Sequence, residues 1–222
     1  MTTGTRRNIH GLVDELAVAA FNRFFVRGRK FFRESSESLG FEEHLHGVEL
    51  ELPEFGGEGY FEVKARSRAV DLDPAFRVAQ WKGTGHPTVI YHHGMFEQPF
   101  DGGFDQVFPL KKIAVPANLI VLRAPFNQSH RQFLAAVREA SNVTVMFAAF
   151  IKLTEGLLAR LREADNRRII VTGLSMGGFV TNLHRAYFNT ADAYIPMLAG
   201  TGRAESSRQR LSASRRSPFA RP

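Results

Sequence analysis

The 222-residue sequence contains no cysteine. This absence excludes disulfide bonds, thiolate metal ligands and a cysteine nucleophile, and it is compatible with a reducing compartment. Hydrophobic residues make up 44% of the chain, which is typical of a globular protein and too high for a disordered one. A chain of this length is sufficient for one good hydrophobic core.

Long apolar runs are also lacking, because no stretch approaches the roughly 20 residues that a membrane span requires. The N-terminus has a basic start followed by apolar residues, as a signal peptide would. However, Asp14 and Glu15 interrupt the apolar part and no clean small-residue cleavage site follows. We therefore expect this segment to be retained and the protein to be cytoplasmic.

Acidic residues are few near the C-terminus, and most of the net positive charge comes from that segment. The chain has 29 basic and 22 acidic residues and a net charge of +7, but residues 203–222 hold six arginines and a single acid, Glu205. Without this segment 23 basic and 21 acidic residues remain, which is a net charge of +2. A nucleic-acid-binding domain would spread its basic residues over a folded face, so no nucleic-acid partner is predicted.

Composition divides the chain into three parts. Residues 1–46 are expected to form an N-terminal helical extension, 47–200 a folded α/β domain, and 201–222 a basic, Ser/Arg-rich disordered tail. Within the extension, apolar residues at three-to-four spacing predict an amphipathic helix over residues 9–33. That helix either packs on the domain or, because basic residues line one of its faces, makes weak contact with a membrane surface or a partner.

The hydrophobic pattern changes along the domain. Residues 47–82 alternate as antiparallel strands do, in GVELELP, YFEVKARS and FRVAQWKG. Later strand candidates are nearly continuous apolar runs, which indicates burial on both faces: TVIYHHG, ANLIVLRAPF, RRIIVTG and a last one over 192–200. Helices are expected between them, as one or two over 130–164 and another after residue 175. This order predicts an α/β fold with a mostly parallel central sheet, antiparallel N-terminal strands and flanking helices.

A serine lies between two glycines directly after one of the buried strands. Residues 173–177, Gly-Leu-Ser-Met-Gly, fit the pattern Gly-x-Ser-x-Gly, which is weak alone and stronger where it closes a strand and opens a helix. Gly173 and Gly177 would let the backbones pass in a strained turn that exposes the Ser175 hydroxyl. The amide of Met176 opens the helix at its positive end, which suits an oxyanion. The alternative is a strand that simply ends in a glycine-rich turn.

A second strand end supports the catalytic interpretation. TVIYHHGMF places His93, Gly94 and Met95 after a buried strand, where a loop that supplies oxyanion donors would lie. Gly94 lets the backbone turn, the amide of Met95 is the candidate second donor, and His93 is expected to support the loop. Adjacent parallel strands bring such loops together at one edge of the sheet.

With these residues the sequence resembles the α/β-hydrolase superfamily, of the esterase, lipase and peptidase kind, over residues 47–200. The resemblance implies Ser175 as nucleophile and the amides of Met95 and Met176 as the oxyanion hole. It also implies an acyl-enzyme formed from a small acyl-ester substrate, with no metal or organic cofactor. The residues that it implies as supporting ones are His93, Gly94, Gly173 and Gly177.

The resemblance breaks down after Ser175. In this family the acid and then the histidine follow the serine in the chain, after strands beyond the sixth in most members, whereas only six strands are predicted here. The one later histidine, His184, lies about 13 Å along the helix at 1.5 Å per residue and is expected on the helix surface. Asp192 precedes its strand, where the acid should follow one. We therefore expect an incomplete fold, truncated after the sixth strand, whose exposed strand 192–200 promotes self-association.

Upstream histidines do not replace the missing base. His92 and His93 are neighbours at a strand end, so their side chains should point to opposite sides, with His93 as the alternative base. His44 and His46 would share one side of a strand but lack a third ligand, so no metal site is predicted. The sequence thus predicts a serine hydrolase that is impaired as written. The alternative is a non-catalytic remnant of the fold that acts in binding or at a membrane surface.

Overall fold

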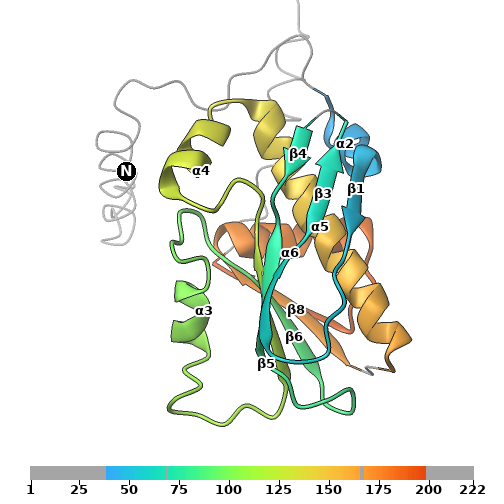
Figure 1. Cartoon of the computed structure of the whole chain (residues 1–222), viewed down its shortest axis with the longest axis vertical. Helices are drawn as coiled ribbons and strands as arrows, with labels where there is room; N and C mark the ends of the chain where they lie inside the picture. Colours follow the sequence, from blue (N-terminus) through green and yellow to red (C-terminus); the bar gives the residue numbers. More distant parts are fainter. Residues whose placement is uncertain (1–38, 69, 166–167, 199–222) are drawn as a thin grey trace, which may run out of the picture.

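The computed structural model describes residues 39–198, apart from residues 69, 166 and 167 (Figure 1). The predicted helix over 9–33 and the predicted tail over 201–222 lie outside the described residues. The helices are α2 (Phe41–Gly47), α3 (Gly102–Val107), α4 (His130–Ala136), α5 (Ala140–Glu163) and α6 (Met176–Tyr187). The strands are β1 (Val48–Glu51), β2 (Gly59–Glu62), β3 (Lys64–Ser67), β4 (Val70–Leu72), β5 (Ala75–Gln80), β6 (Thr88–His92), β7 (Asn118–Arg123), β8 (Ile169–Leu174) and β9 (Ala193–Met197).

A six-stranded sheet forms the centre of the domain, in the order β2-β5-β7-β6-β8-β9. The pairs β2–β5 and β5–β7 are antiparallel, whereas β7, β6, β8 and β9 are parallel neighbours. The predicted α/β class is therefore confirmed, with its antiparallel start and mostly parallel centre. The carboxyl ends of the four parallel strands meet at one edge, and Ser175 follows β8 at that edge.

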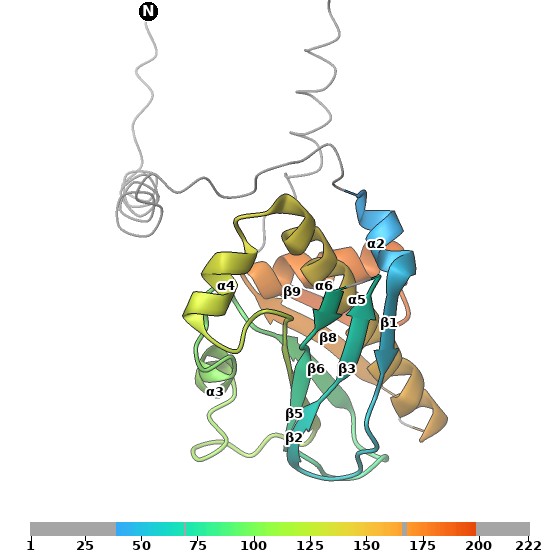
Figure 2. The ribbon, with the colours of Figure 1, turned by 45° about the horizontal axis from the view of Figure 1, so that its top comes forward.

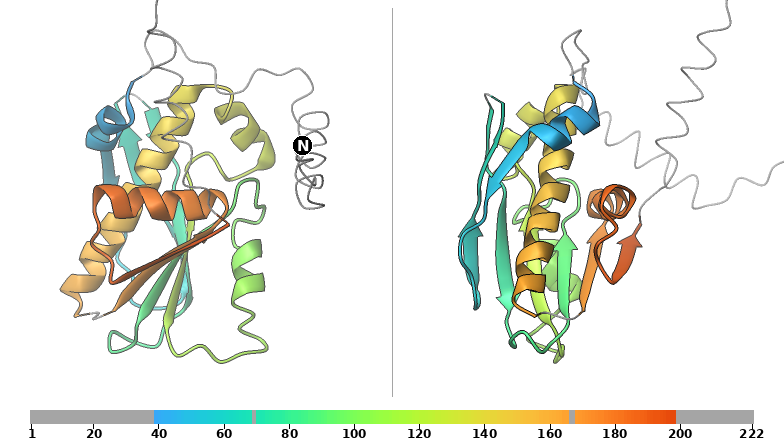
Figure 3. Two further views of the ribbon diagram at one scale, coloured as in Figure 1. Left: turned by 180° about the vertical axis from the view of Figure 1, so that it is seen from behind. Right: turned by 90° about the vertical axis from the view of Figure 1, so that its right-hand side faces the viewer.

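Both faces of this sheet are covered, which explains the nearly continuous apolar runs of its strands. All six residues of β7 are buried. On one face, side chains of α5 and α6 join the sheet in the larger hydrophobic cluster, which includes Ile90, Ile120 and Val171. On the other face, Phe104 of α3 packs with Tyr91, in a smaller cluster. Helix α3 stands apart from α5 and α6 at the left of Figure 1, and Figure 3 shows the same separation from behind.

A second, three-stranded antiparallel sheet joins β1, β3 and β4. It lies beside α2 and α5 (Figure 2). The segment YFEVKARS, expected as one strand, is divided between the two sheets at Val63. Val63 is 3% exposed and its N–H donates to the carbonyl of Pro74 at 3.0 Å. The buried Val63 thus separates β2, which pairs in the central sheet, from β3.

Two helices occupy residues 130–163 rather than one. Ser129 caps α4, and its hydroxyl accepts a hydrogen bond from the backbone of Gln132 at 3.2 Å. Helix α5 then runs unbroken through Gly156. In contrast to the expectation that no segment suits a membrane span, α5 alone among the described residues is long and apolar enough to cross a membrane by length and composition, but 56% of its most apolar 18-residue segment is buried inside the domain. That burial identifies α5 as a core helix.

Strand β9 pairs with β8 alone within the part of the chain that the structure describes. Ile195 is 51% exposed and Leu198 is 86% exposed. The carboxylate of Asp192, just before β9, accepts from Arg162 and from the backbone N–H of Ile169, both at 2.6 Å. Asp192 therefore lies at the opposite edge of the sheet from Ser175. The self-association expected through residues 192–200 stays a prediction.

Candidate active site

Ser175 occupies the sharp turn between β8 and α6. Its backbone has φ 54° and ψ −110°, a region that non-glycine residues rarely adopt and that costs about 1–3 kcal/mol. Hydrogen bonds on both sides hold this conformation: the Ser175 N–H donates to the carbonyl of Met197 at 2.9 Å, and its carbonyl accepts from Phe179 at 3.0 Å. Ser175 itself is exposed. The turn thus presents a serine at the carboxyl edge of the parallel sheet.

The flanking glycines permit a close approach of three backbones. An ideal Cβ on Gly177 would lie 2.1 Å from the carbonyl oxygen of His92 and 2.8 Å from that of His93. An ideal Cβ on Gly173 would lie 2.4 Å from the carbonyl carbon of Gly177. Real Cβ atoms do not come this close to backbone, so α6 can cross the end of β6 only with glycine at these positions.

The two residues expected to supply the oxyanion donors follow the ends of two neighbouring strands, β6 and β8. Met176 is the first residue of α6, a 12-residue helix, so its amide lies at the positive end of the helix dipole. Met95 follows β6, whose His92 lies opposite Gly173 in the parallel register. The loop after β6 touches the turn directly, because an ideal Cβ on Gly94 would lie 3.5 Å from the Leu174 carbonyl oxygen.

His93 is fully buried and both of its ring nitrogens have partners. Nδ1 lies 2.6 Å from the carbonyl oxygen of Gly94, and Nε2 accepts from the backbone N–H of Ala124 at 3.1 Å. Because a carbonyl only accepts, Nδ1 carries the proton. Burial lowers the pKa of His93 to about 4; the Gly94 hydrogen bond acts to raise it and Arg123 to lower it further. The ring is therefore neutral at neutral pH and occupied by backbone contacts.

His92, the last residue of β6, is also buried. Its Nε2 lies 3.2 Å from the hydroxyl of Thr154 on α5. Burial first, and then His184 and His93, hold the pKa of His92 well below its ordinary value. The expectation that His92 and His93 point to opposite sides is wrong, since both rings contact Phe150, with centroids at 4.6 and 5.6 Å. Strand β6 ends at His92, so strict alternation no longer applies to His93.

The sequence predicted His184 on the helix surface, and this prediction is wrong. His184 is fully buried between α5 and the segment that follows α6. Its Nε2 donates to the carboxylate of Glu155 at 3.1 Å, and its Nδ1 lies 3.1 Å from the hydroxyl of Tyr194. Thr190 donates to the same Glu155 oxygen. The surface prediction failed because the partner, Glu155, lies 29 residues earlier on α5, where no local pattern indicates it.

This half-buried pair makes stability depend on pH. Burial acts to raise the pKa of Glu155, but hydrogen bonds from His184 and Thr190 outweigh it, so the folded pKa lies below the ordinary value of 4.5. The contribution of Glu155 is therefore present above pH 4.5 and lost as the pH falls through the folded pKa. Urea denaturation of Glu155→Gln should show a smaller loss of unfolding free energy between about pH 6 and pH 3 than the parent shows. Glu163→Gln, exposed on the same helix, is the control, and equal pH profiles for Glu155→Gln and the parent would contradict the role.

The histidine pair near the N-terminal end of the domain lies on a helix rather than a strand. His44 and His46 belong to α2, whose first turn is stabilised by the Glu43 carboxylate, which accepts from the Gly40 N–H at 2.9 Å. His44 is buried, and its Nε2 lies 3.3 Å from the Ser141 hydroxyl. Among residues 39–198, apart from 69, 166 and 167, no three His, Asp or Glu side chains are grouped to hold a metal ion.

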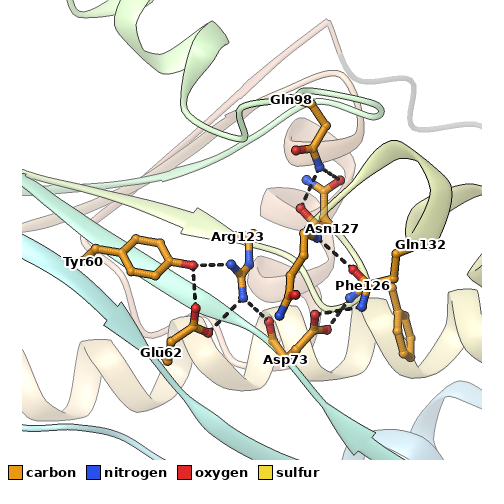
Figure 4. Close-up of polar contacts among 9 residues, drawn as sticks. Tyr60, Glu62, Asp73, Gln98, Arg123, Phe126, Asn127 and Gln132 are labelled. Carbon is orange, nitrogen blue, oxygen red and sulfur yellow. Dashed lines mark hydrogen bonds and ion pairs between the residues drawn. The ribbon is translucent and has the colours of Figure 1, made fainter.

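Sequence reasoning missed a polar network beside the expected oxyanion loop. Asn127 is 1% exposed and touches both His93 and the loop after β6. It is supported by contacts of Asp73 and Arg123, shown in Figure 4. The available signal was the stretch RAPFNQSH, in which polar residues follow the carboxyl end of a fully buried strand.

Comparison with known proteins agrees with this architecture. A family model described as "Alpha/beta hydrolase domain containing 18" matches residues 111–206. Among solved structures, methylesterase BT1017 has a TM-score of 0.51 at 19% identity, over 74% of this chain and 39% of that one. Acetyl xylan esterase 1 from Thermoanaerobacterium sp. JW/SL YS485 has a TM-score of 0.39 at 12% identity, over 87% and 73%. A glucuronoyl esterase from Sporotrichum thermophile has a TM-score of 0.39 at 18% identity, over 75% and 46%. No curated protein sequence matches the chain.

The chain therefore has the fold of the α/β-hydrolase superfamily, as its resemblance implied. It spans about two fifths, 39%, of the methylesterase that it matches. The roles expected of Ser175 and of the neighbouring amides stay predictions.

Proposed function

We propose that the chain is a serine hydrolase of the ester-cleaving type, with Ser175 as nucleophile. The observation that carries the proposal is the backbone of Ser175, held at φ 54° and ψ −110° and exposed at the carboxyl edge of the parallel sheet. A strained conformation persists only where its surroundings over-determine it, and such sites are concentrated where function requires them. The general likeness to hydrolases supports this class of activity.

In the proposed reaction, the Ser175 hydroxyl oxygen attacks the carbonyl carbon of a small acyl ester and loses its proton to a base. The carbonyl oxygen becomes an oxyanion, which the amides of Met95 and Met176 would stabilise. The alcohol leaves with a proton, and water then releases the acid from the acyl-enzyme. The scheme requires no metal or organic cofactor.

Three described histidines that could be expected to serve as the base of the first step are engaged elsewhere. Of the eight histidines in the sequence, seven lie in the described part of the chain. His92, His93 and His184, those nearest the turn in sequence or in strand register, are all buried and engaged by other groups. We therefore propose an impaired enzyme, and the rival class is a non-catalytic member of the fold that binds acyl-like ligands or partners. Cytoplasmic location is likewise a proposal.

Labelling with a fluorophosphonate separates the two classes, because the reagent needs only attack by a serine beside working oxyanion donors and not a complete turnover cycle. We expect covalent labelling of the purified chain, detected by intact mass, and its loss in Ser175→Ala. Ser129→Ala is the matched control, since Ser129 is an exposed serine at the start of α4, and it should label as the parent does. An unlabelled parent would favour the non-catalytic class.

A further inference from the structure

The direction of the Met95 N–H is determined by contacts of the preceding residue. The Gly94 N–H donates to the Glu97 carboxylate at 2.9 Å, and the Gly94 carbonyl accepts from His93 Nδ1 at 2.6 Å. The peptide unit that joins Gly94 to Met95 is planar, and in its trans form the carbonyl and the N–H point in opposite directions. As long as His93 holds the carbonyl, the Met95 N–H points away from the buried imidazole.

Two hydrogen-bond donors in turn determine which ring nitrogen of His93 carries the proton. Nε2 faces the backbone N–H of Ala124 at 3.1 Å and Nδ2 of Asn127 at 3.2 Å. Two donors at Nε2 require that nitrogen to be the acceptor, so the proton is on Nδ1, where it reaches Gly94. Asn127 thereby acts on the Gly94 carbonyl through the imidazole ring.

Asn127 also contacts the far end of the same loop. Its Nδ2 donates to the Glu97 carbonyl at 3.3 Å, and its Oδ1 accepts from the Gln98 side chain at 2.9 Å. The same Gln98 nitrogen donates to the backbone carbonyl of Asn127 at 2.7 Å, as Figure 4 shows. One buried amide thus connects both ends of the segment 93–98.

The loop that carries Asn127 is itself held in place. The Asp73 carboxylate accepts from the backbone N–H of Phe126 at 2.6 Å and from the Gln132 side chain at 2.9 Å. Arg123 donates to the Asp73 carbonyl at 2.7 Å and to Glu62 at 2.9 Å (Figure 4). Fixed supports of this kind are what a preorganised site requires, because a misplacement of about 1 Å reduces rates by about 10²-fold.

We propose that Asn127 is a positioning residue of the site: together with the Ala124 N–H it keeps His93 in its Nδ1-protonated form, and so fixes the direction of the Met95 N–H. The proposal rests on the proposed function for its catalytic meaning, but the contact chain from Asn127 through His93 to Gly94 can be tested separately.

The test uses Asn127→Asp, which keeps the size of the side chain but replaces the donor that faces Nε2 with an acceptor. A carboxylate there favours a proton on Nε2 of His93, which in the neutral ring is the proton that leaves Nδ1, so the bond to Gly94 is weakened; a doubly protonated ring in the variant would keep that bond and contradict the proposal. Nuclear magnetic resonance of the chain labelled with ¹⁵N-histidine should show Nδ1 protonated in the parent and Nε2 protonated in the variant. Asn127→Ala and the control Asn142→Ala, on α5 outside this network, complete the set.

The second measurement is the rate of fluorophosphonate labelling. We expect both Asn127 variants to label about 10- to 100-fold more slowly at saturation, with an unchanged half-saturating concentration, because binding is retained and oxyanion stabilisation is weakened. Asn142→Ala should match the parent, and thermal melting should confirm that every variant is folded.

The outcomes separate the two proposals. A parent that labels, with Asn127 variants that label equally fast, overturns the positioning role and leaves the proposed function intact. An unlabelled parent overturns the proposed function. In that case the ¹⁵N-histidine spectra decide alone: an unchanged His93 signal in Asn127→Asp overturns the contact chain, and a shift of the proton to Nε2 supports it.

Discussion

Turnover of p-nitrophenyl acetate by this 222-residue chain is expected to remain well below about 1 s⁻¹, the lower end of ordinary enzyme rates. The reason is geometric, since the described histidines that are nearest Ser175 in sequence or in strand register are buried and bonded elsewhere. In serine hydrolases without a working triad, the oxyanion hole and binding alone retain about 10³–10⁴-fold over the reaction in water. We expect a residual rate of that order here. It is measured against the uncatalysed hydrolysis in buffer, and the further difference between the parent and Ser175→Ala gives the part that depends on the serine.

A Ser175-dependent rate of about 1 s⁻¹ or more would refute this expectation and would mean that a base is available. His93 would then be the first residue to replace, as His93→Gln. Butyrate should be compared with acetate, because a rate that depends on acyl length but not on Ser175 reports binding and spontaneous hydrolysis rather than an acyl-enzyme.

Gly177→Ala is expected to destabilise the fold by more than about 3 kcal/mol, beyond the ordinary range of overpacking. The added methyl group would lie 2.1 Å from the His92 carbonyl oxygen, and backbone cannot yield as a flexible side chain does. Relief requires α6 to move away from β6, which opens the packing of Met176 and Val180 against the core. Since whole domains are stable by only about 5–15 kcal/mol, the variant should be largely recovered in the insoluble fraction, or unfold at much lower urea.

Gly102→Ala is the matched control. An ideal Cβ on Gly102, in the first turn of α3, meets nothing within 4 Å, so its unfolding free energy should stay within about 1 kcal/mol of the parent. Parent-like stability of Gly177→Ala would show that the elbow can relax, and that the crossing of α6 over β6 is looser than described.

Local patterns predicted what depends on local chemistry. The apolar run before Gly173 and the glycines around Ser175 were sufficient to predict a strand, a turn and a helix in that order, and the structure has all three. The parallel arrangement of β6, β7, β8 and β9 was predicted from their nearly continuous apolar runs and from the helices between them. The short helix α3, between β6 and β7, was missed because six residues carry too little periodicity.

Features that depend on distant partners were not predictable. The burial of His184 depends on Glu155 on another helix, and the tautomer of His93 depends on contacts with Ala124 and Asn127, 31 and 34 residues away. The alternation in the HLH segment predicts a strand, whereas the Glu43 contact to Gly40 favours a helix. One sequence shows which residues can form hydrogen bonds, but the fold decides which of them meet.

The hydrogen bond from the Ser175 N–H to the Met197 carbonyl has a consequence for the order of events during synthesis. Residue 197 leaves the ribosome after residue 175, and N-terminal parts of a chain have the first opportunity to fold. One of the two hydrogen bonds that hold Ser175 at φ 54° is therefore lacking until β9 has docked against β8. The strained turn at Ser175 is then completed late in folding. The kinetic test is a φ-value, the fraction of a mutation's loss of stability that is already felt in the folding transition state. For a substitution of Thr172, whose hydroxyl donates to the Ile195 carbonyl at 2.7 Å, we expect a φ-value near zero, and a value near one would place the docking early.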